Sequence, residues 1–422
     1  MKKIINNINI EKIFIFFLYM QPFLDVSAGI LLHFNYSITI SSIIRFLFMG
    51  LCIIYLLFVI KDKKTNYYLL LLLVYFIFFT ITILVSKDIS TLTYELKNLI
   101  STYYFVIIFL FLLHLYKNNK FEIKNMSIIY IIYLLLVFFP NILNIGFNSY
   151  WHSKEGQSGF FSSANVIGSI LSITLPIVLI NIKKINCKLI ILLLINMYVI
   201  FTVGTKVPVF SFIIILSVNL LYYLISILQK KDYKKIKIML IPIILVIGIS
   251  IYMFPKTTFY KNIIIHINFL EKKDNGNITT KHLIDHFIFS ERLTFEERTR
   301  KAYNKSNILE KVFGIGYIEN YATDKIRLKT IEIDYFDIFY RHGLVGFVLF
   351  FIPIIYILKN KIKIRHYNYV KLNIILSLIL IFTLALFQGH IFVTPNNSIF
   401  VALILSLTYN NSYKLTKKEA IK

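Results

Sequence analysis

Residues 331–346 read IEIDYFDIFYRHGLVG and lead directly into an apolar run that ends near residue 358. Residues 255–335, which precede and overlap this segment, are polar and include 14 basic and 11 acidic residues. Such a stretch cannot cross a bilayer, because each charged side chain that enters hydrocarbon costs several kcal/mol. The sequence therefore predicts a folded loop on one side of a membrane, followed at once by a transmembrane helix.

The rest of the chain supplies the membrane body. Hydrophobic residues make up 57% of the 422 residues, which is above the usual content of soluble domains. About twelve apolar runs approach the length of about 20 residues that a transmembrane helix requires. These runs lie at roughly 13–32, 39–60, 67–85, 97–116, 127–147, 163–182, 188–203, 206–228, 237–254, 336–358, 371–388 and 393–409.

We therefore predict an all-α, polytopic transmembrane helical bundle of about 12 spans. Residues 1–254 are expected to form spans one to nine, and 255–335 the loop with its short helices. Residues 336–422 are expected to form spans ten to twelve and a tail.

The net charge of +25 reports topology rather than nucleic-acid binding. With the N-terminus inside, the cytoplasmic segments hold 26 of the 46 Lys and Arg residues, and the short outer segments hold four. Such a bias orients a chain by the positive-inside rule. It predicts that both termini are cytoplasmic and that the 255–335 loop lies outside.

Several function classes find no support in the sequence. Cys52 and Cys187 give no disulfide framework, and neither a nucleotide-binding loop nor an internal repeat is evident. His282 and His286 are four residues apart, but no third ligand follows at a defined spacing. We therefore expect no metal site, no cofactor and no ATP-driven transport.

Polar residues near the predicted outer ends of spans are candidates for substrate binding. Arg45 fits a functional cation and a side chain that snorkels to the interface equally well, whereas a structural role is favoured for Asp25. Lys206, in a tight outer turn, is open between snorkelling and anion binding. Asn165 fits either a brace at a helix start or a hydrogen-bonding partner for a sugar.

Six local patterns lie on the predicted outer face. They are GFFSSAN at 159–165, GTK at 204–206, SERLTF at 290–295, the Gly-x-Gly turn at 314–316, the 331–346 segment, and QGH with TPNN within 388–397. Helical patterning extends over 282–310, and the two glycines of the turn that follows permit close backbone approach. In their order and topology, and over most of the chain, the six patterns resemble the O-antigen ligase and O-antigen polymerase superfamily of membrane glycosyltransferases.

The resemblance implies a GT-C-like enzyme at the outer face of the bacterial cytoplasmic membrane. Its reaction would move a glycan from a polyprenyl-diphosphate-linked donor to a sugar hydroxyl of an acceptor glycan. Cations must then stabilise the departing diphosphate, and a base must take the acceptor proton. Membrane lipid and other polysaccharide-assembly proteins are the remaining expected partners.

The resemblance also assigns residues to these roles. The cations that fit are Arg292, Lys206 and Arg45. Many family members carry His-Asn eleven residues before the first Gly of the last Gly pair, whereas Glu332 and Ile333 stand here, followed by Asp334. Because a carboxylate also serves as a general base, Glu332 and Asp334 are the catalytic candidates.

Structural interpretations compete with these roles. Arg292 fits a surface residue of a loop helix, and Glu332 or Asp334 could simply complement a helix dipole. We favour function for Arg292 and Glu332 and leave Asp334 open. Asp337 and Arg341, four residues apart with the acid first, predict an intrahelical ion pair instead.

Three functions remain in competition. The leading one is a polymerase that joins lipid-linked repeat units, and a ligase that moves a finished glycan to another acceptor needs the same donor site. A polysaccharide transporter or flippase would place polar groups at the membrane midplane, whereas the candidates here concentrate at the outer face.

Overall fold

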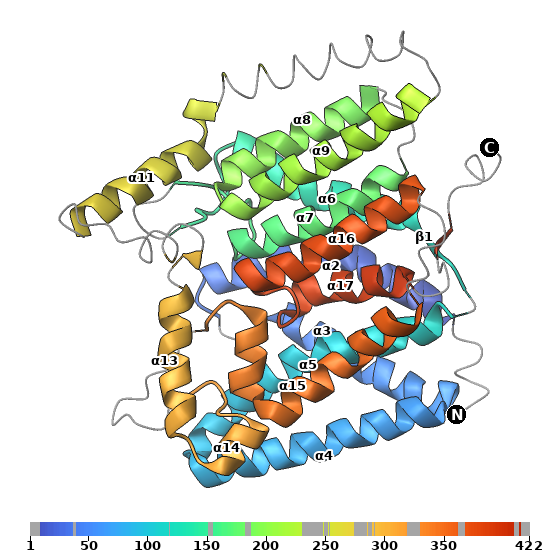
Figure 1. The fold of residues 1–422 in the computed structure, drawn as a ribbon, viewed down its shortest axis with the longest axis vertical. Helices are drawn as coiled ribbons and strands as arrows, with labels where there is room; N and C mark the ends of the chain where they lie inside the picture. Colours follow the sequence, from blue (N-terminus) through green and yellow to red (C-terminus); the bar gives the residue numbers. More distant parts are fainter. Residues whose placement is uncertain are drawn as a thin grey trace.

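The protein is described from a computed structural model (Figure 1). The residues described are 9–36, 39–117, 119–150, 155–181, 187–229, 248, 252, 254–273, 285, 289–290, 292–318, 330–361, 368–408 and 413–414.

Helices dominate the described chain, and most are apolar. Eight helical segments are long and apolar enough to cross a membrane. They are α2 (Ile10–His33), α3 (Ile40–Tyr55) with η1 (Leu56–Ile60), α4 (Lys63–Ser86), η2 (Ile89–Thr91) with α5 (Leu92–Leu115), α6 (Ile123–Ile142), α9 (Lys206–Gln229), α15 (Asp334–Lys361) and α16 (Tyr369–Phe387). Shorter apolar helices are α7 (Ala164–Ile180), α8 (Cys187–Val203) and α17 (Pro395–Leu407).

These helices confirm an all-α polytopic membrane protein. The predicted span at 237–254 lies almost entirely outside the described residues. The total of about twelve spans, the three-part division of the chain and the GT-C-like fold therefore stay predictions.

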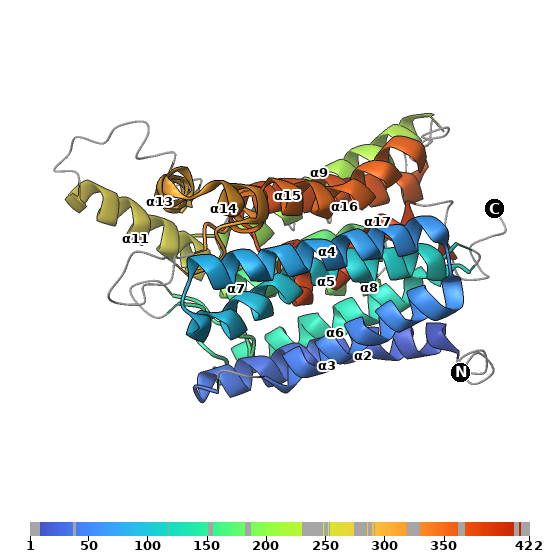
Figure 2. The same ribbon diagram turned by 90° about the horizontal axis from the view of Figure 1, so that it is seen from below.

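The bundle has two distinct ends. The helices η3 (Phe254–Lys256), α11 (Thr258–Lys273), α13 (Arg292–Lys305) and α14 (Ile308–Phe313) come from the 255–335 stretch, and α11, α13 and α14 gather at one end (Figure 2). At the other end, β1 (Phe121–Glu122) pairs in parallel with β2 (Tyr413–Lys414). Near the start of α5, the Glu95 carboxylate accepts hydrogen bonds from the backbone N–H groups of Tyr317 and Ile318, whereas β1 follows the end of α5. The loop helices and the C-terminal strand therefore lie at opposite ends of the bundle.

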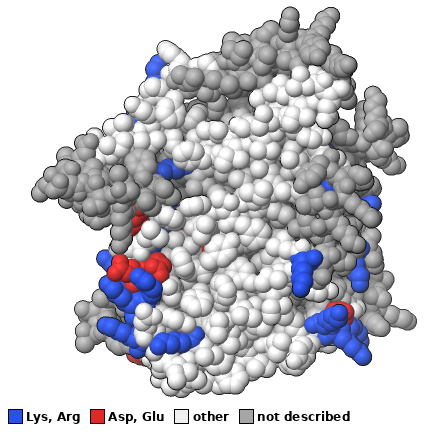
Figure 3. All heavy atoms as spheres, in the orientation of Figure 1, with Lys and Arg blue, Asp and Glu red and all other residues white. Residues whose placement is uncertain are grey.

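The surface between these ends carries little charge. On the face shown in Figure 3, the described charged side chains gather toward the two ends and leave an uncharged area between them. A surface of this kind suits contact with hydrocarbon, where unpaired charge is costly.

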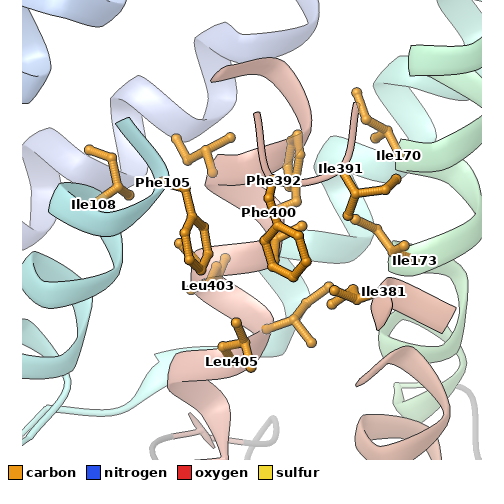
Figure 4. Close-up of a cluster of buried hydrophobic side chains, with 14 of the residues drawn as sticks. Phe105, Ile108, Ile170, Ile173, Ile381, Ile391, Phe392, Phe400, Leu403 and Leu405 are labelled. Atoms are coloured by element: carbon orange, nitrogen blue, oxygen red, sulfur yellow. The ribbon is translucent and has the colours of Figure 1, made fainter. Parts of the chain in front are cut away.

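The centre of the bundle is built around α7 and α17. Both helices are buried along nearly their whole length, as expected for helices that are apolar all round. In Figure 4, Phe400 and Leu403 of α17 pack among Ile170 and Ile173 of α7 and Phe105 of α5. This core supports the segment that connects α16 to α17.

A kink in α15 holds the loop on the bundle. Gly343 leaves the helical conformation with φ 67° and ψ −178°, and the chain bends there (Figure 1). The turn after α14 packs into the bend, where Gly316 N donates to Arg341 O over 3.1 Å. A Cβ atom on Gly314 would lie 2.1 Å from Arg341 O, and one on Gly343 would lie 2.5 Å from Gly314 N. The close backbone approach predicted for the Gly-x-Gly turn is confirmed.

The helical patterning predicted over 282–310 corresponds in part to α13 and α14. Asn307 and Glu310 form a capping box that starts α14. His282 and His286 lie outside the described residues. The described part of the chain contains no group of three or more His, Cys, Asp or Glu side chains arranged to hold a metal ion.

The orientation of the bundle can be tested by thiol labelling. Lys301 on α13 is 71% exposed at its side chain, and native Cys187 at the start of α8 is exposed too. If the loop is outside, a Lys301→Cys variant that also carries Cys187→Ser should react with an impermeant thiol reagent in spheroplasts. Wild-type Cys187 should react only after lysis. The reverse pattern would invert the topology.

Candidate functional site

Most of the predicted site residues converge on residues 387–397, which comprise the last residue of α16, the connection between the two helices and the first three residues of α17. Two side chains of this segment, Ile391 and Phe392, are fully buried in the core and hold its backbone in place (Figure 4). The Phe392 ring lies 5.2 Å from that of Phe105, in an edge-to-face arrangement. Asn397 Nδ2 donates to His390 O over 2.7 Å and closes the turn at the start of α17.

Arg292 and Glu332 form an ion pair beside this segment. Arg292 NH2 lies 2.8 Å from Glu332 Oε2, with side chains 8% and 26% exposed. Arg292 NH1 donates to Phe387 O over 3.1 Å and to Phe289 O over 3.3 Å. Arg292 Nε is buried and makes no hydrogen bond with the described residues.

His390 completes this cluster and was not singled out from the sequence. Its Nε2 lies 3.7 Å from Glu332 Oε1, which is an ion-pair distance and too long for a direct hydrogen bond. Burial opposes charge on Glu332, but His390 and Arg292 outweigh it and lower the pKa of Glu332 to about 2. Burial also opposes charge on His390, but Glu332 outweighs it and raises the pKa of His390.

The backbone of this cluster is strained. Glu332 and His390 both have φ 61°, a left-handed conformation that costs a residue with a Cβ about 1–3 kcal/mol. Between them lies Gly389, with φ 68°, whose added Cβ would come within 2.4 Å of the Glu332 carbonyl carbon. Strain of this kind persists only where surrounding structure enforces it, and it is common at functional sites.

Asp334 also reaches the 387–397 segment, but it is enclosed. Its side chain is fully buried, and Oδ2 accepts hydrogen bonds from Ile391 N and Phe392 N at 2.9 and 2.7 Å. These contacts favour a positioning role for Asp334 over contact with an acceptor sugar.

Arg45 contacts the segment from α3. It pairs with Asp25, and its guanidinium donates to Gln21 at 3.0 Å, Ser41 at 2.6 Å and Asn396 at 3.1 Å. Both charged side chains are at most 4% exposed. This network occupies most of the donors of Arg45, which favours a structural role in anchoring α17 to α2 and α3.

Asn165 and Lys206 lie at the starts of the neighbouring helices α7 and α9. The backbone oxygen of Asn165 accepts a hydrogen bond from Gln388 Nε2 over 2.6 Å. The start of α9 packs on the first turns of α7, since a Cβ on Gly168 would lie 3.1 Å from Pro208 Cγ. Lys206, the first residue of α9, is half-buried and lies two residues from that contact.

The structure therefore brings Arg292 and Glu332 into direct contact and links Asp334, Arg45 and Asn165 to one segment. Lys206 belongs to the same end of the bundle, at the start of α9. His390 could have been found from the sequence, because it stands in the QGH pattern at 388–390.

Fold and site together define a class: a polytopic α-helical membrane protein with a cluster of cations and carboxylates at the end that carries its large loop. The chain belongs to the family of O-antigen ligase like membrane proteins, whose model matches residues 8–285 and 277–411. The resemblance seen in the sequence is thereby confirmed. Membership implies a membrane glycosyltransferase-type enzyme with a lipid-linked glycan as substrate. No curated protein and no solved structure matches the chain significantly.

Proposed function

We propose that the protein is a polymerase that joins polyprenyl-diphosphate-linked oligosaccharide repeat units of a capsular, exopolysaccharide or O-antigen-type glycan. The reaction takes place at the outer face of the cytoplasmic membrane. The observation that carries the proposed glycosyl transfer is the Arg292–Glu332–His390 cluster, which lies against the 387–397 segment at the loop end of the bundle.

The donor diphosphate binds at Arg292, with Lys206 as a second cation. As the acceptor oxygen attacks the anomeric carbon, the bond from that carbon to the diphosphate oxygen breaks. The polyprenyl diphosphate leaves with the bonding electrons. A guanidinium stabilises this developing charge through charge-assisted hydrogen bonds, and this role is assigned to Arg292.

The acceptor proton goes to His390, and the neighbouring Glu332 carboxylate assists the transfer. A carboxylate with a pKa of about 2 is a weak base near neutral pH. His390 in its neutral form accepts the proton better, and Glu332 then stabilises the imidazolium 3.7 Å away. Glu332 thus keeps the catalytic role inferred from the sequence, but shares it with His390.

Ligase-type transfer of a finished glycan is the first alternative, because it requires the same donor site and the same base. A transporter or flippase is the second. It would require polar groups along a path through the bundle, whereas the cluster lies at one end of it.

Glycan analysis of a deletion strain separates the three functions. A polymerase predicts that single lipid-linked repeat units accumulate and that polymer disappears. Full-length polymer without its final attachment would indicate a ligase instead, and units retained at the cytoplasmic face would indicate a flippase. Complementation with wild-type protein provides the control.

A further inference from the structure

We propose that Asp337 is a positioning residue for the catalytic carboxylate Glu332, and that Arg341 serves this role by holding Asp337. The expected effect on turnover rests on the proposed function. The positioning of Glu332 by Asp337 rests on geometry alone. The sequence predicted only an intrahelical ion pair for Asp337 and Arg341.

The ion pair is present, but it accounts for only part of the contacts. Arg341 Nε lies 3.0 Å from Asp337 Oδ1. The same carboxylate accepts two backbone hydrogen bonds, from Ile331 N to Oδ1 at 3.1 Å and from Glu332 N to Oδ2 at 2.9 Å. Asp337 therefore fixes the backbone N–H groups of Ile331 and Glu332.

These hydrogen bonds to Asp337 are made at a residue whose backbone is strained. Glu332 has φ 61°, and Gly389 packs against its peptide from the other side. A left-handed non-glycine residue persists only if its surroundings over-determine it. The Asp337 carboxylate and the 387–397 segment together provide that constraint, and so direct the Glu332 side chain toward Arg292 and His390.

Arg341 is itself fixed. It is fully buried, NH1 donates to Gly316 O over 3.1 Å, and its guanidinium carbon lies 4.8 Å from the centre of the Tyr317 ring. The Gly-x-Gly turn and the α15 kink hold Arg341 in place. Arg341 in turn fixes the orientation of the Asp337 carboxylate. The loop end of α15 is thus connected to the catalytic cluster.

A single substitution of Asp337 cannot separate this role from stability, because it removes the ion-pair partner of the buried Arg341 Nε. The pair Asp337→Leu with Arg341→Met removes both charges together, so that neither substitution leaves a buried charge without its counter-charge. The matched control is Lys87→Met with Glu95→Leu. This second buried ion pair, with side chains 3% and 0% exposed, also holds loop N–H groups, but those of Tyr317 and Ile318 rather than Glu332.

The Asp337→Leu/Arg341→Met variant should be made at normal level and lose turnover about 10²- to 10⁴-fold, as on removal of a positioned base. Its KM for the lipid-linked donor should change little, because Arg292 remains. The Lys87→Met/Glu95→Leu control should keep most of its turnover. Near-normal turnover in the Asp337→Leu/Arg341→Met variant would overturn the catalytic consequence.

Cross-linking tests the positioning without any activity. In a Cys187→Ser background, Glu332→Cys and His390→Cys should be joined by a short bis-thiosulfonate reagent. Adding Asp337→Leu and Arg341→Met should reduce the cross-link several-fold, and adding the control pair should not. An undiminished cross-link would overturn the inference. Full activity of Glu332→Gln would instead reject the catalytic role of Glu332, while the cross-link would still decide the positioning.

Discussion

Replacing Arg292 with lysine should leave a folded protein that binds the lipid-linked donor weakly and turns it over about 10²- to 10³-fold more slowly, the usual effect of losing one stabilising donor. Lysine keeps the positive charge but loses the planar fork, and with it the simultaneous contacts to Phe387 O, Glu332 and the donor. The measurement is donor affinity alongside product formation, with protein level checked by blot. Unchanged affinity and turnover would show that charge alone suffices at this position.

The Glu332→Gln variant provides the contrast. It keeps the shape of the side chain and removes its charge, so donor affinity should stay near normal while turnover falls about 10²- to 10⁴-fold. Because Glu332 raises the pKa of His390, wild-type activity should increase as the pH rises through that raised value and His390 becomes neutral. In Glu332→Gln the pKa of His390 is no longer raised by this carboxylate, so the remaining activity should increase with pH at lower pH values than in the wild type. Full activity would remove Glu332 from the mechanism and leave His390 to accept the proton without it.

The second large effect is expected from Gly389→Ala. The added Cβ would come within 2.4 Å of the Glu332 carbonyl carbon and oxygen, and φ 68° is already unfavourable for alanine. Backbone atoms cannot move aside cheaply, so Glu332 and His390 should separate and activity should fall below about 1% of wild type, comparable to loss of the base.

Gly50→Ala is the matched control, because a Cβ at Gly50 meets nothing within 4 Å. It should retain normal activity and thermal stability. Normal activity in Gly389→Ala would show that the close approach of the 387–397 segment to Glu332 is dispensable.

The parts of the fold that could be predicted depend on local sequence. A span is recognised from its own run of apolar residues, because the bilayer sets its length. The Asp337–Arg341 ion pair follows from i,i+4 spacing on one helix. The Gly-x-Gly turn was likewise recognised as a place for close backbone approach.

The parts that could not be predicted depend on how distant segments pack. Arg292 and Glu332 are 40 residues apart, and Gln388 and Asn165 are 223 apart. Nothing in the local sequence of Arg45 indicates that Asp25, Gln21 and Asn396 surround it. The QGH pattern marks the segment that holds His390, but the placement of His390 beside Glu332 depends on this packing.

The most direct test of the central claim uses purified protein in lipid with a polyprenyl-diphosphate-linked oligosaccharide as both donor and acceptor. Because the account assigns the charge on the leaving diphosphate to Arg292 and Lys206, the protein should act after exhaustive chelation and without any nucleotide. It should release polyprenyl diphosphate and form lengthened lipid-linked glycan, and Glu332→Gln should form little of either. Unchanged donor, or activity that returns only when Mg²⁺ or Mn²⁺ is added, would contradict the account.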